Sequence, residues 1–416
     1  MHRKYILSLF TVLCFALSIQ AQDYTLLIKG GHVIDPKNNI DDIMDVAIKD
    51  DKIALVAKNI DAKKAALVVD AKGMYVTPGV IDIHSHNFFG TQEDHYLGDG
   101  FEALPPDGFT FRAGVTTVVD CGGAGWKTFN TFKANVIAHS KTRVLSFLNI
   151  VGEGMRGGPY EQNLNDMDAK LTAMVVKQHR EIVGIKVAHY TGAEWEPVDR
   201  AVEAGKSANV PVIVDFGGHI PNLSIQELFT KHLRPGDIFT HTFARLAGRQ
   251  PIVGPDGKIL PFVVEAQRNG IVFDVGHGGG SFTFAQAIPA LKSGFLPNTI
   301  STDLHTTSMN AGMKDQLNVM SKFLSMGMTV QQVIKASTWN PAQVIRRDDL
   351  GHLTAGAGAD VAVFSVLTGK FGYVDSGGFK FQGTQKMECE LTLRDGKVVW
   401  DLNGVSRPAW DAPEKK

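Results

Sequence analysis

The sequence predicts an α/β fold: a (β/α)8 TIM barrel with a small β-sandwich domain that the N- and C-terminal segments build together. Eight short apolar segments alternate with helical patterns over roughly 250 residues, as they do in a (β/α)8 barrel. Their near-continuous runs of Val and Ile are typical of parallel strands that are buried on both faces. Both ends of the chain instead show short β patterns separated by Gly, Asp and Asn turns.

The first residues, MHRKYILSLFTVLCFALSIQAQ, have the features of a secretory signal peptide. Arg3 and Lys4 precede an apolar run that is too short for a transmembrane helix, and Ala21 offers a small residue for cleavage. We therefore expect residues 1–21 to be removed and the protein to be exported, either to the periplasm or as a secreted protein. No other apolar run is long enough to span a bilayer.

Residues 23–75 have the pattern of antiparallel strands, and residues 355–405 at the other end have the same pattern. In the second segment, the dipeptide Asp395-Gly396 fits the turn of a β-hairpin. Because chain termini often meet, we expect the two segments to form one accessory β-sandwich. Residues 76–354 between them are expected to form the barrel.

The barrel strands follow one another in the order that a repeated βα unit requires. Helical patterns lie between most of them, for example PVDRAVEAGKSAN and PFVVEAQRN, and TVQQVIKASTWNPAQVI follows the last strand. A doubly wound sheet is the structural alternative, but no GxGxxG motif follows the first strand. The eight strands are expected at 79–86, 115–122, 143–152, 182–190, 210–219, 237–243, 270–280 and 298–305.

Composition excludes some classes of partner and ligand. With 42 basic and 43 acidic residues, the chain gives no reason to expect a nucleic acid or an anionic membrane as partner. Cys121 and Cys389 lie far apart, and we expect two independent small core residues, although the sequence does not say whether either is modified. Because the chain has no CxxC pair, any metal site has to use His and carboxylate ligands.

Ionisable residues gather where the predicted strands end, and in a barrel the carboxyl ends of the strands face the active site. His84 and His86 end the first strand and point to one face, with Cα atoms about 6–7 Å apart. Imidazole and carboxylate ligands suit Zn²⁺, and Mn²⁺, Fe²⁺ or Co²⁺ would also fit them. The candidates at the other strand ends are Lys186, His219, His241, His277 and Asp303.

The sequence resembles the amidohydrolase superfamily of metal-dependent hydrolases from residue 23 to about residue 405. The resemblance rests on the HxH of PGVIDIHSH, the single His after each of strands five and six, and the Asp of STDLH. The stretches GVTTVVDCGGAGW, GIKVAH and FDVGHGGGSF resemble a deacetylase-like subgroup related to dihydroorotases. The resemblance implies that His84 and His86 hold the more buried metal and that His219 and His241 hold the second. It also implies that Asp303 ligates the first metal and hydrogen-bonds the water between the two.

For Lys186, the resemblance implies a carboxylated side chain that bridges two Zn²⁺ ions, because a free ammonium has no lone pair to offer a metal. Two ions are expected, and one ion is the alternative. The competing interpretation of Lys186 is an unmodified barrel lysine that pairs with a carboxylate.

Four further residues are candidates for contact with a substrate: Tyr190, Arg245, His277 and Gly278. Arg245 would suit a substrate carboxylate, although an ordinary surface role fits it as well. For the stretch HGGGSF, a tight turn in which glycines serve backbone geometry is the alternative.

These residues together favour hydrolysis of a carbonyl compound. A metal-activated hydroxide would attack the carbonyl, with Asp303 acting as general base and then as general acid. We therefore expect a hydrolase of a small acylated molecule, first of all a deacetylase of N-acetyl amino acids or acetylated hydroxy acids. The alternatives are a dihydroorotase-like cyclic amide hydrolase, a dipeptidase or D-aminoacylase, and a catalytically silent metal- or ligand-binding protein. The sequence leaves open whether the protein is a homo-oligomer.

Overall fold

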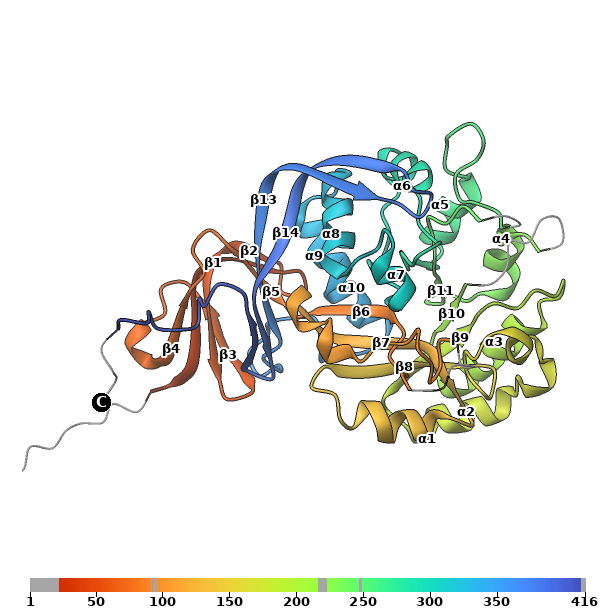
Figure 1. Cartoon of the computed structure of the whole chain (residues 1–416), viewed down its shortest axis with the longest axis horizontal. Coiled ribbons are helices and arrows are strands. Elements are labelled where there is room, and N and C mark those ends of the chain that lie inside the picture. Colours follow the sequence, from red (N-terminus) through yellow and green to blue (C-terminus); the bar gives the residue numbers. More distant parts are fainter. Residues whose placement is uncertain (1–21, 91, 93–95, 216–222, 247–248, 413–416) are drawn as a thin grey trace, which may run out of the picture.

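The computed structural model describes residues 22–90, 92, 96–215, 223–246 and 249–412, which form two β-sheets and a set of helices (Figure 1). The predicted signal peptide lies outside these residues. The strands are β1 (Tyr24–Asp35), β2 (Ile40–Lys49), β3 (Lys52–Ala57), β4 (Ala65–Asp70), β5 (Tyr75–Pro78), β6 (Val80–Ser85), β7 (Val115–Gly125), β8 (Arg143–Asn149), β9 (Ile182–Val187), β10 (Val212–Val214), β11 (Ile238–Phe239), β12 (Val272–Phe273), β13 (Val361–Val374), β14 (Lys380–Arg394) and β15 (Lys397–Asp401). The α-helices are α1 (Phe129–Phe132), α2 (Ala169–Gln178), α3 (Glu196–Ala208), α4 (Ile225–Glu227), α5 (Pro261–Arg268), α6 (Phe284–Lys292), α7 (Thr306–Asn310), α8 (Gln316–Ser325), α9 (Val330–Ser337) and α10 (Trp339–Val344).

The first sheet combines strands from both ends of the chain, and Figure 1 shows it beside the helical part. Its order is β15-β14-β13-β5-β1-β2-β3, with β4 pairing with β1. The pairs are antiparallel except that β1 lies parallel to β4 and β5. Buried Val and Leu side chains from both terminal segments, such as Val46 and Leu391, pack into one core. This shared core is what joins the two ends of the chain.

The predicted hairpin turn in the C-terminal segment is confirmed. Asp395 and Gly396 connect β14 to β15, which pair as antiparallel neighbours. Both residues have positive φ, at 49° and 72°. A two-residue turn of this kind matches the twist of the strands beside it, and Asp-Gly is a preferred sequence for it.

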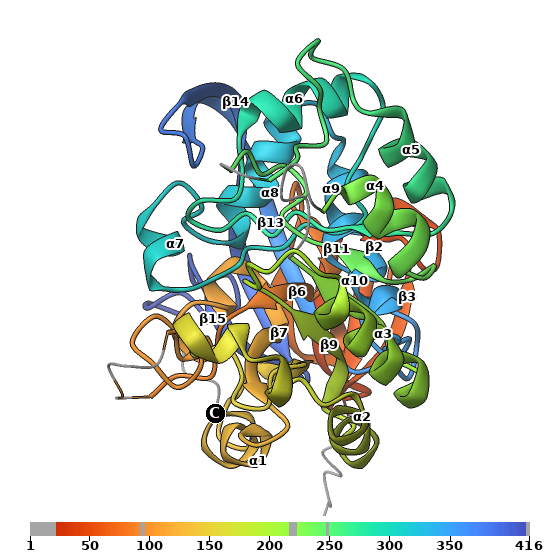
Figure 2. The ribbon, with the colours of Figure 1, turned by 90° about the vertical axis from the view of Figure 1, so that its right-hand side faces the viewer.

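The second sheet is parallel and carries the candidate site. Its order is β12-β11-β10-β9-β8-β7-β6, so each strand lies beside its predecessor in the sequence. Every residue of β6, β7 and β9 is buried. Figure 2 shows these strands in the middle of the view with helices around them. The predicted α/β class is thereby confirmed, with a curled parallel sheet.

The last predicted strand, residues 298–305, is wrong as a strand. This segment makes isolated parallel bridges to both edges of the sheet, Leu304 to Ser85 and Thr299 to Asp274. The backbone of Asp303 has a φ of 54°, which interrupts the extended conformation that a ladder needs. The predicted strands 237–243 and 270–280 are also too long. They shorten to β11 and β12 because His241, with a φ of 55°, and the glycines after β12 turn the chain.

The predicted helices at 197–209 and 261–269 are confirmed as α3 and α5. The helical pattern at 329–345 is instead two helices, α9 and α10, which meet at Thr338. Pro341 explains the break, because its nitrogen has no hydrogen to donate to the carbonyl four residues earlier and its ring crowds that carbonyl.

The long hairpin of β13 and β14 extends from the first sheet over the helical part (Figure 1). It packs against α8, where the Ser321 hydroxyl accepts a hydrogen bond from the backbone N–H of Met387 at 2.9 Å. At the end of β13, the Val374 carbonyl accepts a hydrogen bond from Lys322 of α8 at 2.8 Å. The C-terminal segment therefore contacts α8 as well as the strands of the first sheet.

Two smaller predictions concern cysteines and membranes. Cys121 and Cys389 are both buried and free, as predicted. Among the described residues, no helix combines the length and the apolar character that crossing a membrane would require.

Candidate metal centre

His84 and His86 stand at the end of β6 and are both buried. They face Asp303, which lies in the bridging segment 298–305, one residue before the Leu304 that bridges to Ser85 of β6. Asp303 Oδ1 lies 3.4 Å from His84 Nε2 and 2.9 Å from His86 Nε2. The backbone N–H of Asp303 also donates to the His84 carbonyl at 2.7 Å, which fixes the two residues side by side.

The tautomer of His84 follows from its neighbours. The Thr240 hydroxyl donates to Asp274 Oδ2 at 2.7 Å, so its oxygen has to accept the bond from His84 Nδ1 at 2.9 Å. The proton of neutral His84 therefore sits on Nδ1, and Nε2 presents a lone pair toward Asp303. Hydrogen bonds of this kind orient the histidine ligands of metal sites.

His241, which follows β11, is held in the same way. Its Nδ1 lies 2.6 Å from the Gly276 carbonyl, which can only accept, so Nδ1 is the donor and Nε2 carries the lone pair. Gly276 has a φ of 46°, and a Cβ there would lie 3.0 Å from Nδ1 of both His84 and His241. Only glycine leaves room for the two rings at this position.

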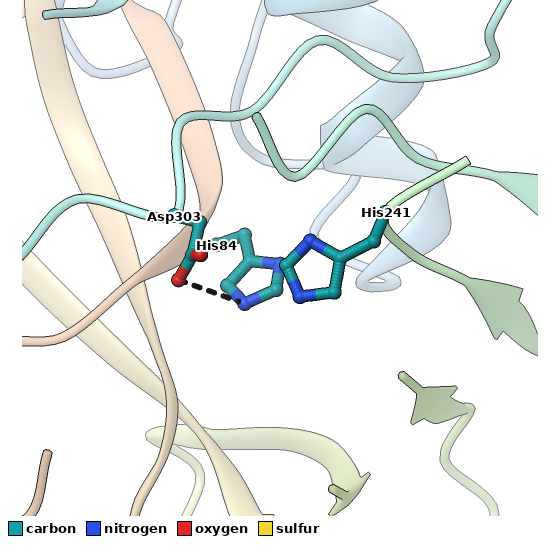
Figure 3. Close-up of side chains that lie close together, drawn as sticks. All are labelled: His84, His241 and Asp303. Carbon is teal, nitrogen blue, oxygen red and sulfur yellow. Dashed lines mark ion pairs between the residues drawn. The ribbon is translucent and has the colours of Figure 1, made fainter. Parts of the chain in front are cut away.

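Figure 3 shows His84, His241 and Asp303 directed toward one another. One ligand atom from each residue lies within 4.8 Å of the others, and all three residues are buried. Burial disfavours the charged form of Asp303, but the hydrogen bond with His86 Nε2 at 2.9 Å favours it, and the pKa of Asp303 lies below its ordinary value. Burial lowers the pKa of His84 to about 3, which keeps its ring neutral.

The donor set fits a divalent metal. It consists of buried imidazole nitrogens directed at buried carboxylate oxygens, and the Nε2 of neutral His84 presents a lone pair to one of them. Two acceptors that face each other repel unless a proton or a cation lies between them. Imidazole and carboxylate are the usual ligands of Zn²⁺ in catalytic sites.

Lys186 of β9 is fully buried beside this cluster. Its Nζ lies 3.0 Å from Oδ2 of Asp215, which directly follows β10. Burial alone would lower the pKa of Lys186, but Asp215 outweighs it and the pKa is raised. Within the described residues, neither Lys186 Nζ nor Asp215 Oδ1 has a hydrogen-bond partner. The sequence analysis left two interpretations of Lys186 open, and this carboxylate contact is the geometry of the second.

Asp215 is the main residue that the sequence analysis missed. Besides Lys186, its Oδ2 lies 3.3 Å from His241 Nε2 and 3.9 Å from His189 Nε2. The other nitrogen of His189 contacts Glu161 at 3.2 Å. Burial opposes protonation of His189, but Asp215 and Glu161 raise its pKa to about 9. The predicted ligand His219 lies outside the described residues.

The predicted substrate residues do not lie together. His277 is buried, stacks on Phe282, and places its Nε2 2.7 Å from Nζ of Lys322. Gly278 lies against the metal ligands, since a Cβ there would lie 2.5 Å from Asp303 Oδ2.

The other two candidates for substrate contact are Arg245 and Tyr190. Arg245 is exposed after the His241 turn. Tyr190 is buried and donates its hydroxyl hydrogen to Glu194. The roles of both residues in substrate binding stay predictions.

A pocket of about 620 Å³ adjoins the cluster through His189. Its volume lies in the range of small-molecule sites. Arg156 brings a cation to it, and Gln162 and Thr191 bring hydrogen-bonding groups. Its lining is Tyr96, Arg156, Gly157, Gly158, Glu161, Gln162, His189 and Thr191.

Comparison with known proteins places the chain among enzymes of related architecture. Residues 283–399 match the Amidohydrolase family. A deacetylase of Agrobacterium fabrum is 34% identical over 337 residues, which cover 79% of this chain and 80% of that protein. Among solved structures, an adenine deaminase has a TM-score of 0.80 at 28% identity, covering 91% of this chain and 100% of that one. A dihydroorotase has a TM-score of 0.79 at 30% identity, covering 90% of this chain and 99% of that one.

Proposed function

Because the chain belongs to the amidohydrolase superfamily, as a deacetylase-like hydrolase, we propose that it is a metal-dependent deacetylase of small acylated acids. N-acetyl amino acids and acetylated hydroxy acids are the substrate classes. The observation that carries the proposal is the buried cluster of His84, His241 and Asp303, in which two fixed imidazole lone pairs face carboxylates. The deacetylase names of similar proteins support the acyl specificity.

The metal would be held by His84, His86 and Asp303, with His241 and Lys186 at a second position. Zn²⁺ is the first choice, with two ions expected and Lys186 carboxylated; Mn²⁺, Fe²⁺ or Co²⁺ are the alternatives. When bound, a divalent ion of this kind lowers the pKa of a coordinated water and polarises a carbonyl oxygen.

The chain's own residues account for the proton movements. The hydrogen bond with His86 favours the ionised form of Asp303, so its other oxygen can accept a proton from the attacking water. The same carboxyl then gives that proton to the leaving amine or alkoxide. Thr240 and the Gly276 carbonyl orient the rings of His84 and His241 through their Nδ1 atoms.

The pocket beside His189 supports a small substrate. Its Arg156 would meet the carboxylate of an acylated amino or hydroxy acid, and the acyl carbonyl would point toward the metal cluster. This assigns to Arg156 the role that the sequence analysis gave to the exposed Arg245.

The architecture around the site is part of the proposal. We take the curled parallel sheet as a (β/α)8 barrel in which residues 298–305 occupy the eighth strand position. The bridges of this segment to both edges of the sheet support that view. We take residues 23–75 and 355–405 as a β-sandwich and residues 76–354 as the barrel domain, and we propose export through residues 1–21.

A cyclic amide hydrolase is the second candidate. The likeness to a solved dihydroorotase at 30% identity over almost the whole of that chain favours it. Hydrolysis of a cyclic amide and of a linear acetamide both require attack of hydroxide on an amide carbonyl. The two candidate functions therefore differ in the shape of the leaving group and not in the reaction. A dipeptidase or D-aminoacylase activity is tested by the same screen.

The test is a hydrolysis screen with the purified chain that lacks residues 1–21, reconstituted with Zn²⁺. The panel contains N-acetyl amino acids of both chiralities, acetylated hydroxy acids, dihydroorotate and dipeptides. We expect acetate release from one of the first two classes, and Asp303→Asn serves as the inactive control. Turnover of dihydroorotate alone would favour the second candidate. Bound metal without any turnover would show a silent binding protein.

A further inference from the structure

The carboxylate of Asp215 is the meeting point of three basic side chains. Its Oδ2 lies 3.0 Å from Lys186 Nζ, 3.3 Å from His241 Nε2 and 3.9 Å from His189 Nε2. The side chain is 3% exposed. Burying a carboxylate is costly unless positive charge and hydrogen bonds compensate it, so this position needs a specific cause.

From this arrangement we infer that Asp215, and not His219, supplies the strand-five ligand of the second metal position, together with His241. The inference rests on the proposed metal-dependent function. It changes the predicted ligand set by exchanging an imidazole for a carboxylate.

A ring nitrogen of His241 is directed at Asp215. The Nδ1 of His241 bonds to the Gly276 carbonyl, so Nε2 is the ring atom that faces Asp215 Oδ2. His84 and Asp303 repeat this arrangement on the other side of the cluster, where Nδ1 of His84 bonds to Thr240 and Nε2 faces Asp303 Oδ1. Imidazoles that are held through one nitrogen and present the other are typical of histidine ligands in metal sites.

The distances between facing nitrogen and oxygen atoms also fit a shared metal ion. Two ligands that each lie about 2.0–2.1 Å from a tetrahedral Zn²⁺ are about 3.3 Å apart. His241 Nε2 and Asp215 Oδ2 are 3.3 Å apart, and His84 Nε2 and Asp303 Oδ1 are 3.4 Å apart. Each separation is longer than an ordinary charged hydrogen bond. Each is also close to the distance between two ligand atoms of the same tetrahedral Zn²⁺.

The simpler reading is an ion pair between Asp215 and Lys186. In a purely structural ion pair, the remaining donors and acceptors would also form hydrogen bonds, because a buried polar atom without a partner costs free energy. Among the described residues, Lys186 Nζ makes no hydrogen bond of normal geometry, and Asp215 Oδ1 has no partner. Both open atoms belong to groups that a metal or a carboxylated lysine would engage.

The position of Asp215 in the fold agrees with a ligand. It directly follows β10, the strand between β9 with Lys186 and β11, after which His241 comes. In the register of these strands, Val214 lies opposite Val187 and Phe239. Lys186 lies opposite Ile213, two residues before Asp215, and the contacts of Asp215 with Lys186 and His241 show that its side chain reaches the ends of both neighbouring strands.

A carboxylate at this position has a chemical consequence. A second dication near the first raises the positive charge of the site, and Asp215 together with Asp303 and a carboxylated Lys186 would offset it. A carboxylate is also a harder ligand than an imidazole, so it raises the affinity of the second position for Mn²⁺ relative to a site with two histidines.

The experiment counts metal ions in matched variants. Asp215→Ala, Asp215→Asn and His219→Ala are purified, stripped with chelator, reloaded with Zn²⁺, and analysed by elemental mass spectrometry. We expect about two ions per wild-type chain, about one in both Asp215 variants, and about two in His219→Ala. Asp215→His should recover the second ion, since an imidazole can replace the carboxylate. Circular dichroism of each apo form shows whether the variant is folded.

The outcomes separate the inference from the proposed function. Loss of the second ion from His219→Ala with both ions kept in Asp215→Asn would overturn the assignment of Asp215. One ion in the wild type and one in every variant would also overturn it, while the proposed hydrolase would stand. A wild-type chain that binds no metal would refute the proposed function itself.

Discussion

Lys322 is a buried lysine that ties three segments together beside the metal centre. From α8, its Nζ donates to the Gly312 carbonyl at 2.7 Å and to the Val374 carbonyl at 2.8 Å. It also lies 2.7 Å from Nε2 of His277, whose Nδ1 faces the Gly278 carbonyl and is therefore the protonated nitrogen. Three acceptors thus surround an ammonium with three donors. We predict that Lys322→Met destabilises the protein and disturbs the metal centre.

The size of the effect follows from these contacts. Each buried acceptor that loses its donor costs about 1–3 kcal/mol, which gives roughly 3–9 kcal/mol for the three. Part of this loss is offset, because burial lowers the pKa of Lys322 from 10.5 to about 7, a shift that corresponds to about 4–5 kcal/mol. Met fills a similar volume without that cost. The loss exceeds the offset by at most about 5 kcal/mol, so we expect a net loss of up to about 5 kcal/mol in the free energy of unfolding.

The pH dependence gives a second and more specific readout. Between about pH 7 and pH 10.5, Lys322 is neutral in the folded chain and protonated in the unfolded chain. The unfolded state then binds more protons, so this group makes the folded state more stable as the pH rises through that window. Lys322→Met lacks this contribution. The difference in stability between wild type and variant should therefore grow from pH 7 to pH 10 and stay constant below pH 7.

Urea unfolding at pH 6, 8 and 9.5 measures both quantities, with Lys335→Met as the control. Lys335 is an exposed lysine on the neighbouring helix α9, so the same substitution there should change stability by less than about 0.5 kcal/mol. In the metal-loaded enzyme, Lys322→Met should also lower kcat on the order of tenfold, because the Gly278 backbone packs on Asp303. Equal effects of both substitutions, or a pH-independent difference, would refute the role given to Lys322.

Three further predictions test the centre itself. Asp303→Asn should keep much of the metal but lower kcat by about 10²–10⁴-fold, and full activity at full metal content would show that Asp303 is not the base. Lys186→Ala should lose activity, and added short carboxylic acids should restore part of it by replacing the carboxylated bridge; a metal-replete, fully active variant would remove Lys186 from the site. Thr240→Val should weaken metal binding by about 10–100-fold in calorimetric titration, because His84 loses the hydrogen bond that fixes its tautomer. Unchanged affinity in Thr240→Val would show that Asp274 alone orients the ring.

The parts of the fold that the sequence predicts well are those with strong periodic patterns. β7 and β9 are buried along their whole length and contain the Val and Ile residues of the predicted strands, and α3 and α5 have clear apolar faces, so local pattern and tertiary burial agree. The strands that run short end at residues with positive φ, such as His241 and Asp303. A left-handed backbone conformation at a His or Asp is uncommon and is determined by the surrounding packing. A local sequence pattern therefore does not predict where the strand ends.

The same division applies to the site. His84, His86 and Asp303 could be predicted to meet because the ends of parallel strands lie at one edge of a sheet, whatever the details of packing. The tautomers could not be predicted, since they depend on which side-chain and backbone oxygens end up beside each ring, here Thr240 and the Gly276 carbonyl.

Asp215 shows why residue type alone misleads at a strand end. In the stretch VPVIVDFGGH, the sequence predicts His219 as the ligand because histidine is a less common residue and a frequent metal ligand. Aspartate is common and is mostly exposed to solvent, so Asp215 is not distinguished by its residue type. The structure distinguishes Asp215 by its contacts, since Oδ2 of its carboxylate lies 3.0 Å from Lys186 Nζ and 3.3 Å from His241 Nε2. These contacts depend on how β10 pairs with β9 and β11, and a strand pattern in the sequence does not fix that register. A sequence can therefore predict the edge of the sheet at which ligands gather, but not which of two polar residues after a strand reaches the site.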